Sequence, residues 1–168
     1  NFILRDRQYK KEDELLMAKI LVKNKVTNQF LLLREKGFQM NFRDRVIELD
    51  RKLNRIKDEK ELLGMEGNYS KDFFREYFRS IGWIRRAPST KFDPNNVLLD
   101  IGYTFMFNFV DALLKLYGFD TYKGFYHKLF FQRKSLSCDI VEPFRCIIDR
   151  QLLKAYNLRQ INNDDFEY

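Results

Sequence analysis

Apolar residues recur every three or four positions along most of the chain, which is the spacing of one face of an α-helix. Residues 12–36 carry such a series and Gly37 follows as a stop signal, so an amphipathic helix is predicted there. Residues 41–63 carry a second series with the spacing of a short heptad seam. The seam consists of Phe42, Val46, Leu49, Leu53 and Ile56. The two helices are expected to pack as antiparallel neighbours. The other faces of the first carry Lys19, Lys23 and Lys25.

The middle of the chain predicts two further helices. After Gly64, an aromatic face over residues 66–81 indicates a third helix. The pair Asp93-Pro94 is a strong helix start, because aspartate caps the first turn well and proline is favoured at the first helical position. The helix that this pair opens runs to about Tyr117 and is apolar on nearly all sides. We therefore expect it to be buried at the centre of the fold.

A last long helix is predicted from Ser135 to about Tyr156. Pro143 lies inside it and cannot donate a hydrogen bond to the carbonyl of Asp139, so we expect a kink beside that aspartate. The residues expected to face inward are Leu136, Ile140, Phe144, Ile147 and Leu152. Few segments alternate between apolar and polar residues as strands do, and the predicted fold class is all-α.

The whole chain, residues 1–168, is predicted to be one helical domain. Its 168 residues are 45% hydrophobic and 16% aromatic, which is enough material for one well-packed core. Within it, residues 1–63 are expected to form a helical pair. Residues 64–168 are expected to form the core that carries the chemistry.

The charge balance is basic. Lysine and arginine number 31 against 24 aspartates and glutamates, a formal net charge of +7. Such a charge favours a polyanionic partner, although a basic protein without one fits the number equally well. No apolar run reaches the roughly 18 residues of a membrane span, so no membrane association is expected. Cys138 and Cys146 lie eight residues apart in one predicted helix, roughly 12 Å and beyond disulfide reach, which predicts reduced, cytosolic thiols.

Three groups of residues could carry chemistry. Glu66 lies between Gly64 and Gly67, where it could meet a ligand or simply offset a helix dipole. His127 is the single histidine of the chain, and most single histidines are structural. Asp139 shares a helix face with Glu142 and Arg145, which by itself is more typical of a solvated stripe.

The combination of these groups is more informative than any one of them. Glu66, His127 and Asp139 together form a mixed oxygen and nitrogen donor set that suits Mg²⁺ or Mn²⁺ and leaves positions for water and phosphate. No serine or cysteine stands in a recognisable nucleophile motif beside the histidine. Metal-assisted phosphoryl transfer is therefore the reaction class that remains.

Several ordered motifs resemble a known family. They are Gly64-Met65-Glu66-Gly67, Asn95-Asn96-Val97-Leu98-Leu99 leading to Gly102-Tyr103, Gly124-Phe125-Tyr126-His127, and the run from Ser135 to Arg145. Gln8-Tyr9 and Lys25-Val26-Thr27-Asn28-Gln29 agree as well. Over nearly the whole chain, the order and spacing of these motifs are similar to the C-terminal helical domain of the CRISPR adaptation integrase, the Cas1 family.

The resemblance implies a function and a site. It implies a metal-dependent DNA integrase and endonuclease that joins the 3′-hydroxyl ends of short spacer DNA to a CRISPR repeat by transesterification. Glu66, His127 and Asp139 would bind the Mg²⁺ or Mn²⁺ ion. Tyr103 could reach the scissile phosphate, or it could be a core tyrosine. Glu142 would help to orient the metal ligands.

Further residues take supporting roles in this interpretation. The expected contacts to DNA phosphates are Arg85, Arg86, Lys128, Arg133 and Lys134. Arg145 is expected beside Glu142, where the two would orient the ligands as an outer shell. Many relatives carry an acidic residue soon after the histidine, whereas residues 128–134 here are basic and aromatic.

The resemblance also implies partners. These are double-stranded DNA, a second copy in a homodimer or dimer of dimers, and a small ferredoxin-like CRISPR subunit, in the cytoplasm of a prokaryote. The family's N-terminal β-rich dimerisation domain is not in this chain, so either it lies outside these residues in a longer protein or the protein is an unusually compact variant. Two other functions remain open: a catalytically silent DNA-binding or assembly subunit, and a related transposon integrase.

Overall fold

The computed structural model describes residues 2–10, 14–89, 93–162 and 165–166. Its α-helices are α1 (Phe2–Gln8), α2 (Glu14–Glu35), α3 (Phe42–Arg55), α4 (Glu59–Tyr77), α5 (Pro94–Leu116), α6 (Ser135–Val141) and α7 (Arg145–Asn157). Two short 3₁₀ turns, η2 (Arg79–Ile81) and η3 (Glu142–Phe144), complete the order. No strand occurs among the described residues, and the predicted all-α fold class is confirmed.

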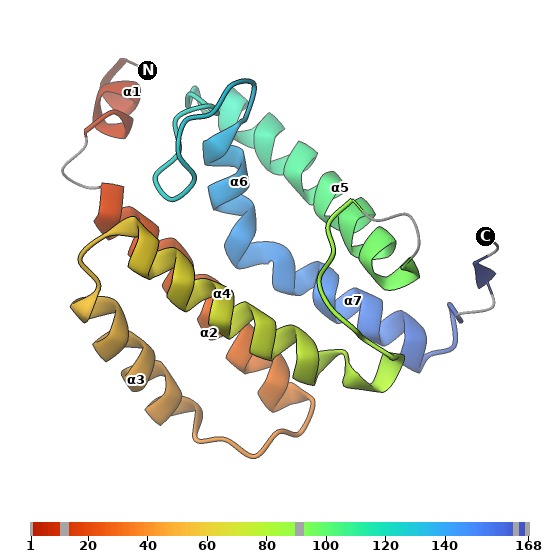
Figure 1. Ribbon diagram of the computed structural model, residues 1–168. Coiled ribbons are helices and arrows are strands. Elements are labelled where there is room, and N and C mark those ends of the chain that lie inside the picture. The colour runs from red at the N-terminus through yellow and green to blue at the C-terminus, as the bar shows by residue number, and fades with distance from the viewer. Residues whose placement is uncertain (1, 11–13, 90–92, 163–164, 167–168) are drawn as a thin grey trace.

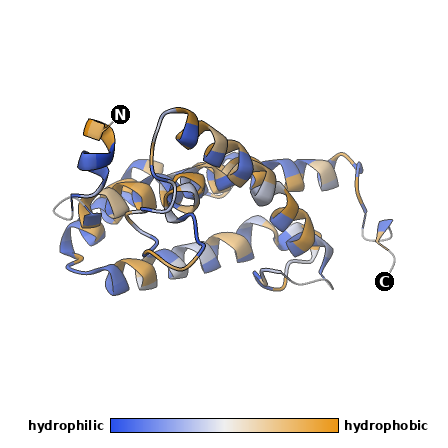
Figure 2. Ribbon diagram, turned by 90° about the horizontal axis from the view of Figure 1, so that it is seen from above, coloured by the Kyte–Doolittle hydropathy of each residue, from blue (hydrophilic) through white to orange (hydrophobic). Residues whose placement is uncertain are grey.

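The helices form a layered bundle (Figure 1). α2 and α3 make the predicted antiparallel hairpin, and α4 runs beside α2. α6 and α7 lie on the side of α2 opposite α3, and α5 packs against α6 and α7 at the edge of the bundle. Hydrophobic and hydrophilic residues both occur along the helices (Figure 2). The buried apolar residues of the described ranges form two clusters, one around α2, α3 and the start of α4, and one where the end of α2 meets α4, α5 and α7.

The boundary between α3 and α4 differs from the prediction. The expected second helix, 41–63, is interrupted after Arg55, and α4 begins at Glu59 and continues through both Gly64 and Gly67. Asp58 starts the new helix, because its side chain accepts hydrogen bonds from the next backbone N–H groups at 2.8 and 3.0 Å. A glycine inside a helix costs only about 1 kcal/mol, so neither glycine ends α4.

Helix α5 begins as predicted but is not the buried centre of the fold. Asp93 caps it by accepting a hydrogen bond from the Asn96 N–H at 3.2 Å. One face packs inward, whereas Phe105 and Phe109 on the opposite side are 72% and 65% exposed. Although α5 contains no uninterrupted apolar run of 18 residues, it is long and apolar enough on average to cross a membrane by length and composition alone. Only 22% of the apolar stretch of α5 is buried inside the fold.

The kink at Pro143 is confirmed. The chain passes from α6 through η3 into α7, and the Glu142 N–H, in place of the missing proline N–H, bonds to the Asp139 carbonyl. The kink changes which side faces inward, so Phe144 and Ile147 are about half exposed, contrary to the prediction. The two cysteines on either side of the kink are free thiols. The bend also directs Glu142 toward α2.

Candidate active site

Asp139, at the end of α6, organises the loop that carries His127. Its side chain is completely buried and accepts backbone hydrogen bonds from Phe125, Tyr126 and His127 at 2.6, 2.9 and 2.9 Å. The imidazole Nδ1 of His127 lies 2.6 Å from the same carboxylate. These four contacts use the acceptor positions of both carboxylate oxygens. Asp139 is therefore fully occupied by the loop.

Gly124 makes this close approach possible. A Cβ atom at this position would lie 2.7 Å from Asp139 Oδ2 and 2.9 Å from the His127 carbonyl. Gly102 is a second close contact, with Ile148 only 2.4 Å from the position of a Cβ. By contrast, nothing lies within 4 Å of such an atom at Gly64 or Gly67. The glycines beside Glu66 therefore do not bring the backbone close to another group.

The contact with Asp139 sets the tautomer of His127. In a neutral imidazole whose Nδ1–H donates to a carboxylate, Nε2 carries no proton and can bind a metal ion. A histidine held from behind by a carboxylate in this way is the usual arrangement for a metal-binding imidazole. His127 lines a cavity of about 590 Å³ together with Glu66.

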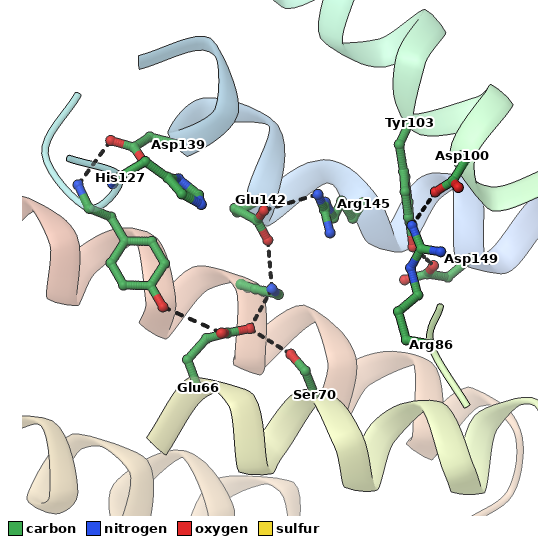
Figure 3. A network of polar contacts seen from close by, with 12 residues as sticks. Glu66, Ser70, Arg86, Asp100, Tyr103, His127, Asp139, Glu142, Arg145 and Asp149 are labelled. Atoms are coloured by element: carbon green, nitrogen blue, oxygen red, sulfur yellow. Dashed lines mark hydrogen bonds and ion pairs between the residues drawn. The ribbon is translucent and has the colours of Figure 1, made fainter. Parts of the chain in front are cut away.

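The Glu66 side chain reaches this cavity from a position midway along α4. Its Oε1 accepts hydrogen bonds from Lys25 Nζ at 2.5 Å and from the Ser70 hydroxyl at 2.6 Å. Its Oε2 has a long contact of 3.4 Å from the Tyr126 hydroxyl. Figure 3 shows Glu66 reaching from α4 toward the side on which His127 and Glu142 lie. Oε2 is consequently the oxygen that is most available to a ligand.

Lys25 connects the two glutamates of the cavity. Its Nζ lies 2.5 Å from Glu66 Oε1 and 2.5 Å from Glu142 Oε2, and its side chain is only 11% exposed. Burial lowers the pKa of Lys25, but the charges of Glu142 and Glu66 outweigh that cost and leave it raised. Burial raises the pKa of Glu142, yet Lys25 and Arg145 hold it below its usual value. The prediction that Lys25 lies on an outer face of its helix is wrong.

The cavity wall is strongly basic. Six basic residues contribute to it against Glu66 and Glu142 as the acidic ones. The basic residues are Lys25, Lys71, Arg75, Arg85, Arg86 and Arg145. Lys71 and Arg75 were not predicted from the sequence, although their i, i+4 spacing on the helix of Glu66 places all three on neighbouring turns. The site therefore joins two carboxylates and an imidazole with a surface that suits phosphate groups.

The predicted DNA contacts separate into two groups. Arg85 and Arg86 line the cavity, and Arg86 is also held by Asn96 at 2.7 Å and by an ion pair with Asp100. Outside its lining are Lys128, Arg133 and Lys134. Lys128 pairs with Glu59 at 2.8 Å, and Lys134 pairs with Asp111 at 2.9 Å. Only the arginine pair is therefore brought to the predicted metal ligands.

Tyr103 belongs to a buried network next to the cavity. It is 6% exposed and its hydroxyl donates a hydrogen bond to Asp149, as Figure 3 shows. The Arg145 guanidinium lies 4.6 Å from its ring centroid and that of Arg86 lies at 5.6 Å. The contact between the Tyr103 hydroxyl and the scissile phosphate stays a prediction. To make it, the hydroxyl would first have to break its hydrogen bond to Asp149.

The predicted metal ligands are brought together only in part. Across residues 2–10, 14–89, 93–162 and 165–166, no three Asp, Glu, His or Cys side chains are close enough to hold a metal ion. Glu66 and His127 line one cavity, whereas Asp139 stands behind the histidine. A carboxylate and an imidazole suit Mg²⁺ or Mn²⁺, which fill their other positions with water and phosphate oxygens. Glu66 and His127 are thus of the donor types that such an ion prefers, and Asp139 would act through its contact with His127.

Asp139→Asn is expected to lower the free energy of unfolding by about 1 to 3 kcal/mol. The amide NH₂ cannot accept, so at least one backbone N–H of residues 125–127 loses its buried partner. Urea unfolding monitored by circular dichroism measures the change. The matched control is Asp50→Asn, which alters an aspartate whose side chain is 41% exposed. Equal stability of the two variants would contradict the role of Asp139 in holding the loop.

The fold and the site define a helical, basic domain with a carboxylate–imidazole centre. The sequence profile of the family "CRISPR associated protein Cas1" matches residues 1–168, and the chain belongs to this family. It is 33% identical to CRISPR-associated endonuclease Cas1 1 of Thermodesulfovibrio yellowstonii, over 99% of this chain and 57% of that protein. It is 29% identical to CRISPR-associated endonuclease Cas1 3 of Thermus thermophilus, over 92% and 47%.

Solved structures agree on the fold. A casposase bound to its integration product matches with a TM-score of 0.82 and 24% identity, over 97% of this chain and 49% of that chain. A chain of a partial Cas6-RT-Cas1–Cas2 complex matches with a TM-score of 0.80 and 27% identity, over 95% and 51%. A Cas1 protein from Thermotoga maritima gives 0.77 and 24%, over 99% and 57%. The chain thus spans about half the length of the proteins that it matches.

Proposed function

We propose that this chain is the catalytic helical domain of a DNA integrase and endonuclease of CRISPR adaptation. The observation that carries the proposal is the meeting of Glu66 and His127 in one cavity with a basic wall. The reaction would be a transesterification at phosphorus. The oxygen of a spacer 3′-hydroxyl loses its proton and forms a new P–O bond, and the bond to the 3′-oxygen of the repeat strand breaks, so that this oxygen takes up a proton and leaves as a 3′-hydroxyl. One phosphodiester replaces another, and no covalent bond to the protein is needed.

The residues of the chain divide the work in this proposal. Glu66 and His127 would hold the divalent ion, and Asp139 would fix the imidazole through its contact with Nδ1. When bound, Mg²⁺ or Mn²⁺ lowers the pKa of an attacking hydroxyl and offsets charge on the phosphoryl oxygens. Arg85 and Arg86 bind phosphates on either side of the reacting one. The ion pairs of Glu142 keep Lys25 and Arg145 in place.

The proposed partners follow from the same family. Double-stranded DNA is the substrate, both as spacer precursor and as repeat, and the site lies in the cytoplasm of a prokaryote. Two of the structural relatives are described with an integration product and in a complex with Cas2. We propose that the working enzyme is a homodimer or dimer of dimers and takes up a small ferredoxin-like subunit.

The test is a strand-transfer assay with the longest natural polypeptide that contains this chain. A labelled short duplex with free 3′-hydroxyls is incubated with plasmid, with or without a CRISPR repeat, in Mg²⁺, Mn²⁺ or EDTA. Joined product in either metal but not in EDTA is expected, and in the repeat-bearing plasmid it should lie at the repeat. Joining without preference for the repeat would favour the transposon-type integrase. Salt-dependent DNA binding without joining in any metal would favour a silent assembly subunit.

A further inference from the structure

Lys25 has a position that the proposed reaction does not explain. Its ammonium group lies between Glu66 and Glu142, at 2.5 Å from each, on the cavity that also holds His127. The carboxylate that would ligate a divalent ion is thus already paired with a cation from the protein. Ser70 also donates to Oε1 of Glu66, and Arg145 lies 3.2 Å from Oε1 of Glu142, so Oε2 of Glu66 is the carboxylate oxygen left for an ion, next to the Lys25 ammonium.

The surrounding charges make this arrangement unusual for a metal site. The cavity wall carries six basic and two acidic side chains; Asp72, Glu76 and Asp100 pair with two of the basic ones from outside it, and among the described residues Lys71 and Arg85 have no ion pair. A divalent cation that binds Glu66 would stand next to the Lys25 ammonium. Repulsion between such charges is several times stronger in a partly buried cavity than in water. Without a further negative group, the site therefore disfavours the very ion that the reaction uses.

A DNA phosphate supplies that negative group. Its oxygens can ligate the ion and at the same time pair with the basic wall. We infer that Lys25 is an internal counter-cation that makes divalent-metal binding depend on bound DNA. This inference rests on the proposed function. It adds that the metal ion and DNA each bind tightly only when the other is also bound. Because coupling between two ligands is reciprocal, the metal must tighten DNA binding by the same factor.

The experiment measures Mn²⁺ binding by the electron paramagnetic resonance signal of free Mn²⁺. It uses the longest natural polypeptide containing this chain, with and without a short duplex whose 3′ ends lack the hydroxyl and cannot react. In wild type, DNA is expected to raise Mn²⁺ affinity at least about tenfold, within the usual range of coupling between sites. Lys25→Met should bind Mn²⁺ about tenfold more tightly without DNA, and the gain from DNA should shrink.

Lys23→Met is the matched control. Lys23 lies on the same helix but pairs at 2.7 Å with Asp50, and its side chain is 42% exposed. It should bind Mn²⁺ as wild type does. Circular dichroism and thermal unfolding show whether both variants fold. If Lys25→Met does not fold, the inference is tested by the Mn²⁺ affinity of wild type with and without DNA. Equal affinity under the two conditions overturns it.

The remaining outcomes separate the inference from the proposed function. Equal Mn²⁺ affinity of wild type and folded Lys25→Met in the absence of DNA overturns the role of Lys25 and leaves the metal-dependent reaction standing. Absence of Mn²⁺ binding in wild type with DNA overturns both, because no divalent ion then reaches the site. A Lys23→Met variant that behaves like Lys25→Met shows a general charge effect and also overturns the inference.

Discussion

His127→Ala is expected to slow metal-dependent strand joining by roughly a thousandfold, which corresponds to about 4 kcal/mol of lost transition-state stabilisation. The reason is that alanine removes the one imidazole among the described residues that line the cavity, so Glu66 alone would remain of the two proposed ligands. DNA binding should persist, because Arg85 and Arg86 remain in the wall. The measurement is the initial rate of joined product in Mn²⁺, alongside DNA affinity at the same salt concentration.

The control for this loss is a change in the same loop that leaves the site intact. Leu129 follows two residues later and is 72% exposed, so Leu129→Ala should join DNA at nearly the wild-type rate. His127→Ala removes one of four hydrogen bonds to Asp139 and should lower stability by only about 1 kcal/mol. If His127→Ala retained more than a tenth of the wild-type rate, the imidazole would not be a metal ligand.

Much of the fold could be predicted from periodicity and capping, and the errors have identifiable causes. Asp93-Pro94 predicted the start of α5, whereas the equivalent helix-start signal at Asp58 was missed and the break was placed at Gly64. Glu61 completes that signal, since it accepts a hydrogen bond from the Lys57 N–H at 2.8 Å. The exposure of α5 had no such signal, because apolar composition indicates what a helix can bury and not which neighbours cover it.

The candidate site was predictable where single residues stand in motifs and not where distant residues meet. The motifs pointed to Glu66 and His127, and both line the cavity. Lys25 was assigned to solvent, as lysines seldom lie buried unless they are paired. Its partners come from α4 and η3, and only the assembled fold brings them to α2. The hydrogen bonds from the loop to Asp139 could not be predicted either. They come from backbone N–H groups, which a sequence does not distinguish from one residue to the next.

Asp149→Asn is expected to stabilise the protein at neutral and alkaline pH. Asp149 is buried beside Tyr103 and Arg145, and burial raises its pKa to about 7 despite the hydrogen bond from Tyr103 and the charge of Arg145. Its unfolded-state pKa is about 3.9. Between these values the unfolded chain has released a proton that the folded protein keeps. Wild-type stability therefore falls as pH rises from about 4 to 7 and is level above.

Asparagine removes this pH dependence while its oxygen can still accept the hydrogen bond of Tyr103. The difference in unfolding free energy should grow from under about 1 kcal/mol near pH 4 to roughly 4 kcal/mol above pH 7, at about 1.4 kcal/mol per pKa unit. Urea unfolding at pH 4, 6 and 8 measures it. Asp111→Asn should show the opposite sign, because the hydrogen bonds that Asp111 accepts from Lys115, Lys134 and Ser137 outweigh its burial and lower its pKa to about 2. If the difference in unfolding free energy between Asp149→Asn and wild type did not change with pH, the pKa of Asp149 would not be raised. The folded protein would then keep this carboxylate ionised, with its charge balanced by Arg145.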